Sequence, residues 1–147
     1  MPNAVVDVVI DTVVFVRSLI NPKSIWGELV FRRRDRYRLI VSQVIVAELY
    51  DVMERPEVAR KFRFVATEGP DTIRDLIVEA IMVDPMALPW SGRDPNDDVF
   101  IATAMAAGAP YVVSEDRGLL DIGNYEGITM VDAATFLALL AENQSGR

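Results

Sequence analysis

Short apolar runs alternate along the chain with longer segments whose apolar residues recur every three or four positions. Runs rich in β-branched residues predict buried strands, because such side chains pack well on a pleated surface. These predicted strands cover residues 4–10, 37–41, 81–83, 111–113 and 128–131. The longer segments predict helices over residues 12–20, 23–34, 43–53, 56–65, 71–80, 95–107, 116–120 and 133 to about 140.

Breaker and cap residues mark several boundaries between these elements. Asn21-Pro22 ends the first predicted helix, and Gly69-Pro70 predicts a turn. Ser42 and Asp94 are predicted N-caps, and Gly108 is the predicted end of the helix that begins at Pro95.

Alternation of strands and helices predicts a parallel sheet with helices on both faces, which is a three-layer α/β/α domain. We expect about four to five strands in this sheet. The 147 residues contain no repeat and no linker, so we expect a single domain over residues 1–147, with a flexible tail from about residue 142.

Three acidic residues are predicted at the carboxyl edge of the sheet, where ligands bind in such folds. Asp11 directly follows the first predicted strand, and Asp116 lies just past the strand at 111–113. Asp97 falls in the first turn of the helix that follows the strand at 81–83. Each has a simpler interpretation when taken alone: Asp11 as a turn residue, Asp97 as a helix-dipole partner, and Asp116 as an N-cap.

Glu48 is unusual because it lies on the apolar stripe of its predicted helix. The stripe is formed by Val41, Val44, Ile45, Leu49 and Val52. An ionised side chain on an inward face requires a partner. Two partners remain open: a cation shared with the other acids, or a buried ion pair with Arg17.

The chain contains no His and no Cys, which narrows its chemistry. Nucleophilic Ser–His–Asp and Cys–His sites, His-based acid–base catalysis, and ordinary zinc or haem sites are excluded. Oxygen ligands remain, and these suit Mg²⁺ or Mn²⁺. Convergent carboxylates would raise each other's pKa values, and a divalent ion would remove that conflict. We therefore predict a metal site formed by Asp11, Glu48, Asp97 and Asp116.

The net charge of −7 argues against a simple DNA-binding domain. A local basic run nevertheless suggests a role in RNA binding, with a solvated helix end as the alternative. Its members are Arg32, Arg33, Arg34, Arg36 and Arg38. No apolar run is long enough to span a bilayer, and the start of the chain lacks a basic leader. With no Cys, we expect a cytoplasmic protein without disulfides.

Several segments together resemble the PIN-domain nucleases over nearly the whole chain. VVIDTVVF resembles the opening strand and Asp-Thr-Asn motif of the family, and SQVIVAEL resembles its second acidic segment. RDPNDDVFIATAMAAGAPYVVSEDRGLL resembles the third and fourth segments, and NYEGITMVDAATFLALL the closing strand and helix. This resemblance assigns the third acid to Asp97 rather than Asp98. The supporting positions beside the acids are Thr12, Ser42, Asp94, Asp98 and Ser114.

The resemblance implies a PIN-like fold and a metal-dependent ribonuclease that cleaves single-stranded RNA with Mg²⁺ or Mn²⁺. It also implies a VapC-like toxin of a prokaryotic toxin–antitoxin pair, with a cognate antitoxin protein as partner and a homodimer as the expected assembly. These implications come from the family and not from composition or spacing.

Two positions depart from the family pattern. Val13 stands where the family usually has Asn, and Gly118 where many members carry another Asp. They leave open a catalytically impaired fold that acts as an RNA- or protein-binding module. A third interpretation is a phosphohydrolase with Asp11 as nucleophile. Val13 counts against it, because such enzymes usually carry a second Asp at this position.

Overall fold

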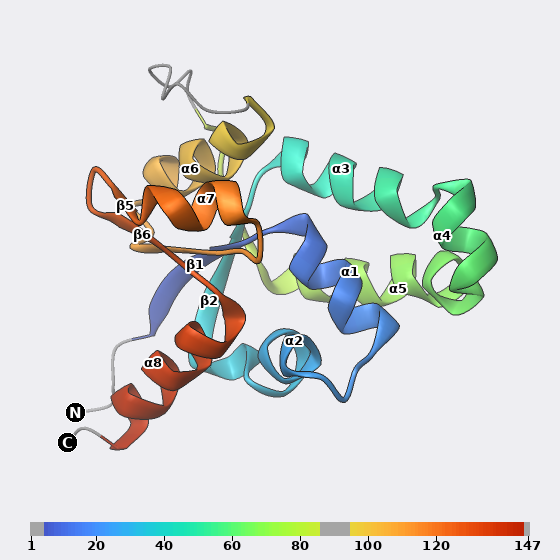
Figure 1. Ribbon diagram of the computed structural model, residues 1–147, viewed down its shortest axis with the longest axis horizontal. Helices are drawn as coiled ribbons and strands as arrows, with labels where there is room; N and C mark the ends of the chain where they lie inside the picture. The colour runs from blue at the N-terminus through green and yellow to red at the C-terminus, as the bar shows by residue number, and fades with distance from the viewer. Residues whose placement is uncertain (1–4, 86–94, 146–147) are drawn as a thin grey trace.

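The computed structural model describes residues 5–85 and 95–145 of the chain, and side chains within 5–85 and 99–143. In these ranges a single sheet has six strands in the order β3-β2-β1-β4-β6-β5 (Figure 1). The strands are β1 (Val6–Ile10), β2 (Tyr37–Val41), β3 (Ile81–Met82), β4 (Tyr111–Val113), β5 (Asn124–Tyr125) and β6 (Ile128–Val131). All neighbouring strands are parallel except β5 and β6. The predicted parallel sheet is confirmed, with β5 as an additional short antiparallel strand.

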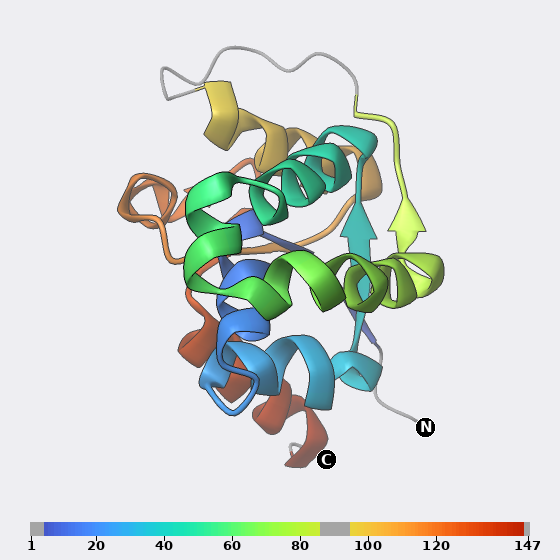
Figure 2. The ribbon, with the colours of Figure 1, turned by 90° about the vertical axis from the view of Figure 1, so that its right-hand side faces the viewer.

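Helices connect these strands and cover the sheet. The helical segments are α1 (Thr12–Ile20), α2 (Ile25–Gly27), η1 (Glu28–Arg32), η2 (Arg34–Arg36), α3 (Gln43–Met53), α4 (Pro56–Lys61), α5 (Arg63–Glu79), α6 (Pro95–Ala107), α7 (Arg117–Ile122) and α8 (Ala133–Ser145). Figure 2 shows β2 and β3 side by side and parallel, with the long helix α5 leading into β3. None of the helices in the described ranges is long and apolar enough to cross a membrane.

Two hydrophobic cores lie on opposite faces of the sheet. Val8 and Ile10 of β1 belong to the larger core, which also holds buried residues of α1, α3, α5 and α8. Val9, between them, belongs to the second core, which α6 and α7 cover. This alternation is the two-residue period of a strand buried on both faces. The three-layer α/β/α arrangement is therefore confirmed.

The sequence prediction of a turn at Gly69-Pro70 is wrong, because both residues lie inside α5. Gly69 is buried, and a Cβ there would lie 2.9 Å from the sulfur of Met53. The absence of a side chain thus allows α5 to pack closely on α3. Pro70 donates no helical hydrogen bond, but its carbonyl oxygen accepts a hydrogen bond from the Tyr50 hydroxyl at 3.4 Å. Tertiary packing outweighs the local tendency to turn.

The helix predicted over residues 23–34 is also interrupted. It consists of α2, one π-helical turn in η1 and the 3₁₀ turn η2. The amide of Arg33 donates to the carbonyl of Glu28 at 2.9 Å rather than to that of Leu29. The Leu29 carbonyl instead accepts a hydrogen bond from the buried Tyr37 hydroxyl at 2.8 Å. This distant contact accounts for the change in the hydrogen-bond ladder.

Two helix ends differ from the sequence prediction. The helix predicted over 56–65 ends at Lys61, because Phe62 leaves helical geometry with φ −130° and α5 begins after it. The last helix continues from Leu140 to Ser145. Residues 141–143 of this extension are exposed, and the apolar pattern therefore gave no sign of them. The predicted cap Asp94 lies outside the described residues.

Candidate functional site

The carboxyl ends of β1 and β4 meet at the point where the strand order reverses direction. β1 pairs with β2 on one side and with β4 on the other. Such a topological switch point opens a crevice outside the strand ends. Asp11 follows β1 directly, and Ser114 follows β4. The fold therefore brings residues from opposite ends of the sequence to one edge.

Asp11 is the buried acid at this edge, with 5% of its surface exposed. Its Oδ2 accepts a hydrogen bond from the Ser114 hydroxyl at 2.7 Å, and its Oδ1 accepts one from the Val13 amide at 3.3 Å, which caps α1. Burial is the main cause that raises the pKa of Asp11, and the charges of Glu48 and Asp116 raise it further. The two hydrogen bonds oppose this shift.

Glu48 reaches the same edge from α3 and is half-buried. Its Oε1 accepts a hydrogen bond from the Thr12 hydroxyl at 2.7 Å. The predicted apolar stripe is only partly correct, because Ile45 and Leu49 are buried but Val44 is 56% exposed. The alternative ion pair with Arg17 does not form.

Arg17 instead lies over the ring of Trp26, with its guanidinium carbon 4.9 Å from the ring centroid. This cation–π contact is on the exposed side of α1. Glu48 is therefore held by the Thr12 hydroxyl, which contacts one of its two carboxylate oxygens.

Asp116 has a structural role as well as a place at the site. Its Oδ2 accepts a hydrogen bond from the Leu119 amide at 3.0 Å, so it is the N-cap of α7. Its own amide donates to the Ser114 hydroxyl at 2.9 Å. Ser114 thereby joins Asp11 to the start of the Asp116 loop, and the predicted cap is observed.

These side chains open onto a shared pocket of about 220 Å³. The pocket is lined by Asp11, Thr12, Val13, Glu48, Val52, Arg55, Phe100 and Asp116. Carboxylate oxygens are the donors that hard divalent cations prefer. Within the ranges that the structure describes, however, no three acidic side chains are close enough together to form a metal site. The carboxylate oxygens of the pocket are suitable ligands for such an ion, while the described acidic side chains are farther apart than the ligands of one metal site.

Asp97 and Asp98 lie in the first turn of α6, and their side chains fall outside the described residues. The position of this turn is nevertheless informative, because Phe100, three residues after Asp97, lines the pocket. Residues three apart on a helix share a face. The place of Asp97 at the site stays a prediction.

Ser42 and Thr103 form a buried hydroxyl pair between two helices of the site. Ser42 caps α3 by accepting a hydrogen bond from the Ile45 amide at 3.4 Å. The Thr103 hydroxyl lies 3.0 Å from that of Ser42. The pair connects the helix that carries Glu48 to α6. The predicted cap at Ser42 is observed. Thr103 was not predicted as a site residue, although a hydroxyl within the apolar run ATAM is a signal that could have identified it.

Glu115 is a further residue that sequence reasoning missed. Its Oε2 accepts hydrogen bonds from the Trp26 indole nitrogen at 3.2 Å and from the Ala133 amide at 3.0 Å. The loop between β4 and α7 is thus attached to α2 and to the start of α8. Because Glu115 lies between Ser114 and Asp116, these contacts hold the loop that carries both.

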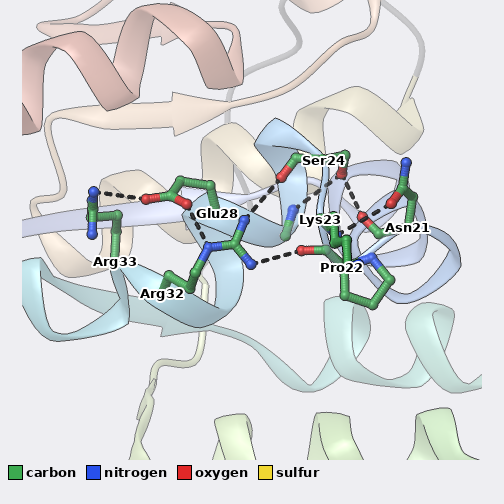
Figure 3. A network of polar contacts seen from close by, with 8 residues as sticks. Asn21, Pro22, Lys23, Ser24, Glu28, Arg32 and Arg33 are labelled. Atoms are coloured by element: carbon green, nitrogen blue, oxygen red, sulfur yellow. Dashed lines mark hydrogen bonds and ion pairs between the residues drawn. The ribbon is translucent and has the colours of Figure 1, made fainter.

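The basic run lies at the other end of β2, away from the pocket. β2 begins at Tyr37 and its carboxyl end leads to Ser42 and α3. Arg32 and Arg33 both pair with Glu28, and Arg32 also donates to the carbonyl of Pro22 at 2.9 Å (Figure 3).

The other arginines of this run are paired as well. Arg34 pairs with Glu79, Arg36 with Asp35, and Arg38 with Asp7. The structure thus places the run outside the pocket, and its predicted contact with RNA stays a prediction.

Of the two departures from the family pattern, Val13 lines the pocket and Gly118 lies in α7. Val13 is 44% exposed and lines the pocket, so an apolar side chain faces the place where the family carries an amide. Gly118 is half-buried in α7, two residues after Asp116.

Comparison with known proteins agrees with this architecture. The PIN domain family model matches residues 7–118, which is more than half of the chain. The crystal structure of PAE2754 from Pyrobaculum aerophilum is similar, with a TM-score of 0.62, 16% sequence identity, and coverage of 92% of this chain and 90% of that chain. At this identity the likeness concerns the fold alone. The curated proteins contain no match to this chain.

Proposed function

We propose that this chain, which belongs to the PIN domain family, is an endoribonuclease that cleaves single-stranded RNA with Mg²⁺ or Mn²⁺. Family membership supports a nuclease in general, and the finer assignment is our own. One observation carries it: the buried carboxylate of Asp11 shares a pocket at the switch point of the sheet with Glu48 and Asp116. A cation bound here would offset the cost of burying the Asp11 charge and the repulsion from the two neighbouring acids.

Asp11, Glu48 and Asp116 would hold the divalent ion, together with Asp97 from α6. When bound, such an ion supplies Lewis-acid chemistry that activates water and offsets negative charge on a phosphodiester. The protein's own contribution is to position the carboxylates. The hydroxyls of Ser114 and Thr12 each fix one carboxylate through a 2.7 Å hydrogen bond.

The decisive experiment measures cleavage of single-stranded RNA with Mg²⁺ or Mn²⁺, and its loss in EDTA. We expect Asp11→Asn to lower the cleavage rate by about a hundredfold or more, because it removes a charged ligand from the pocket. Asp7→Asn is the matched control, since Asp7 lies in β1, the strand that Asp11 follows, but pairs with the exposed Arg38. Equal rates for Asp11→Asn and the parent protein would contradict the proposal.

A catalytically impaired PIN fold is the second candidate, and Val13 favours it. An exposed valine at the pocket cannot make the hydrogen bonds of the amide that the family carries there. Calorimetric titration with Mn²⁺ distinguishes the two candidates. Metal binding that is lost in Asp11→Asn supports the nuclease. No binding up to millimolar Mn²⁺ supports a fold that binds RNA or protein without cleaving.

We also propose a biological role as the toxin of a toxin–antitoxin pair, acting as a homodimer. The resemblance of the sequence segments to VapC-like proteins supports this role. A short neighbouring gene that encodes a DNA-binding head and a flexible tail is the expected antitoxin. Expression of the chain alone should inhibit growth, and co-expression of the antitoxin should restore it. If the parent chain affects growth no more than Asp11→Asn does, the role is contradicted.

A further inference from the structure

Arg55 stands out at the pocket because it is a cation among carboxylates. Of the described residues that line the pocket, Arg55 is the one basic residue, beside Asp11, Glu48 and Asp116. Its side chain is 49% exposed, so the guanidinium is accessible to a ligand. The family resemblance assigned no role to it.

The position of Arg55 is set by two helices. Glu48, Val52 and Arg55 follow one another at intervals of four and three residues, and all three line the pocket. Glu48 and Val52 share one face of α3, while Arg55 follows the end of that helix. α3 ends at Met53, and Pro56 begins α4, so Arg55 connects two helices in extended geometry with φ −62° and ψ 136°. A proline favours this backbone conformation in the residue before it.

The present partner of Arg55 holds it only weakly. Its Nη2 lies 3.5 Å from Oδ2 of Asp51, whose side chain is 73% exposed. Exposed ion pairs of this length contribute little to stability. Arg38, by comparison, donates two hydrogen bonds to Asp7, at 2.6 and 3.2 Å. Arg55 can therefore leave Asp51 and bind another anion with only a small loss of stabilising free energy.

An RNA backbone that enters this pocket meets three carboxylates. Repulsion between these acids and the phosphates opposes binding unless positive charge lies nearby. A guanidinium matches a phosphate in charge and in its paired hydrogen-bond geometry. Val13, Val52 and Phe100 also line this pocket, and their apolar side chains provide no positive charge.

We infer that Arg55 binds a backbone phosphate of the single-stranded RNA that enters the acidic pocket. The inference rests on the proposed function, because it takes RNA to be the substrate. The contact is to the backbone, so it adds affinity without choosing a base sequence. It also explains how an acidic chain retains a polyanion beside its carboxylates.

The test is binding of a short fluorescein-labelled single-stranded RNA of mixed sequence, measured by anisotropy in Ca²⁺ with the RNA shown to stay intact. We expect Arg55→Ala to weaken binding about tenfold, and to make the slope of log affinity against log KCl less negative by about one. Arg55→Lys should keep the slope and lose part of the affinity, because it retains the charge without the paired geometry.

Arg74→Ala is the matched control. Arg74 is an exposed arginine of α5 that pairs with Asp71 at 3.2 Å, so its loss changes the net charge equally but outside the pocket. It should leave affinity and salt slope unchanged. Equal effects of Arg55→Ala and Arg74→Ala, or no RNA binding by the parent protein, would overturn the inference.

Cleavage measurements separate this inference from the proposed nuclease activity. If the parent cleaves RNA with Mn²⁺ but Arg55→Ala leaves KM and its salt dependence unchanged, the inference fails and the nuclease stands. If Arg55→Ala weakens RNA binding as expected but the parent does not cleave, the nuclease fails and the inference stands. Thermal unfolding of each variant confirms that the exposed substitutions leave the fold intact.

Discussion

At the scale of single residues, the site depends on short polar side chains that fix larger charged ones. The Ser114 hydroxyl donates to Asp11 and accepts from the Asp116 amide, so one side chain joins two predicted ligands. The Thr12 hydroxyl donates a single hydrogen bond to Glu48. Ordered hydrogen bonds of this kind reduce the freedom of the carboxylates before any ligand arrives.

Asp11 should make the stability of the metal-free protein depend on pH. Burial raises the pKa of Asp11 in the folded state above its ordinary value of about 4 in the unfolded chain. The folded state then holds its proton more strongly, so stability falls as pH rises from the unfolded pKa through the folded one. Above that window, the penalty for the buried charge is fully present.

Asp11→Asn should therefore unfold at a higher temperature than the parent at pH 7 in EDTA, by a few degrees. The difference should shrink as pH falls toward the ordinary pKa of an aspartate. Differential scanning calorimetry over this pH range is the measurement. A parent that is more stable than Asp11→Asn at neutral pH without metal would contradict the cause given for the shift.

At the scale of elements, connections between helices and strands decide where the site residues lie. Glu115 attaches the β4–α7 loop to Trp26 and to the start of α8. Ser42 and Thr103 connect α3 to α6. The segment from Asn21 to Gly27 closes a compact turn beneath α1, with the Ser24 hydroxyl donating to Asn21 and accepting from the Gly27 amide (Figure 3).

Two glycines provide a matched prediction at this scale. A Cβ on Gly27 would lie 1.9 Å from the carbonyl oxygen of Pro22, so the backbone of the turn must move. A Cβ on Gly69 would meet the flexible thioether of Met53 at 2.9 Å, and alanine favours the helix by up to about 1 kcal/mol. Urea unfolding should show a loss of about 2–4 kcal/mol for Gly27→Ala.

Gly69→Ala should change the free energy of unfolding by less than about 1 kcal/mol, since the clash and the helix preference offset each other. Both variants add one methyl group to a glycine. The difference between their unfolding free energies therefore reflects the Pro22 backbone beside Gly27 and the flexible Met53 side chain beside Gly69. Equal losses would show that close packing of α5 on α3 is as rigid as the turn around Gly27.

At the scale of the whole molecule, negative charge is concentrated where the fold brings distant segments together. The chain has a net charge of −7. Its basic run is neutralised by Glu28, Glu79, Asp35 and Asp7 at the other end of β2. The pocket acids, in contrast, share one described basic neighbour, Arg55. A divalent cation bound by these acids should therefore raise the stability of the whole domain.

We expect the unfolding temperature to rise with the logarithm of Mn²⁺ concentration, because an ion that binds only the folded state stabilises it by mass action. Asp11→Asn and Glu48→Gln should abolish this rise, while Asp7→Asn should retain it. Scanning fluorimetry over micromolar to millimolar Mn²⁺ is sufficient. An unchanged unfolding temperature in the parent would argue against a cation site.

The sequence alone determined most elements, because their signals are local. β2, α1, α3, β4 and β6 begin and end where the pattern of apolar residues and caps predicted. Strand-end placement also led directly to Asp11 and Asp116, since each follows a short apolar run that predicted a buried strand. The family resemblance then distinguished Asp97 from Asp98, and the side chains of both lie outside the described residues.

Only the tertiary structure decided which of these local features prevail and which side chains meet. The long helix through Gly69 and Pro70 packs on Met53 and Tyr50, which are distant in sequence. The π turn at Glu28 accompanies the hydrogen bond from Tyr37 to Leu29, eight residues apart. The contacts Ser114–Asp11 and Thr12–Glu48 span 103 and 36 residues. Burial and pairing across such separations are properties of packing, and a pattern of neighbours along the chain carries no record of them.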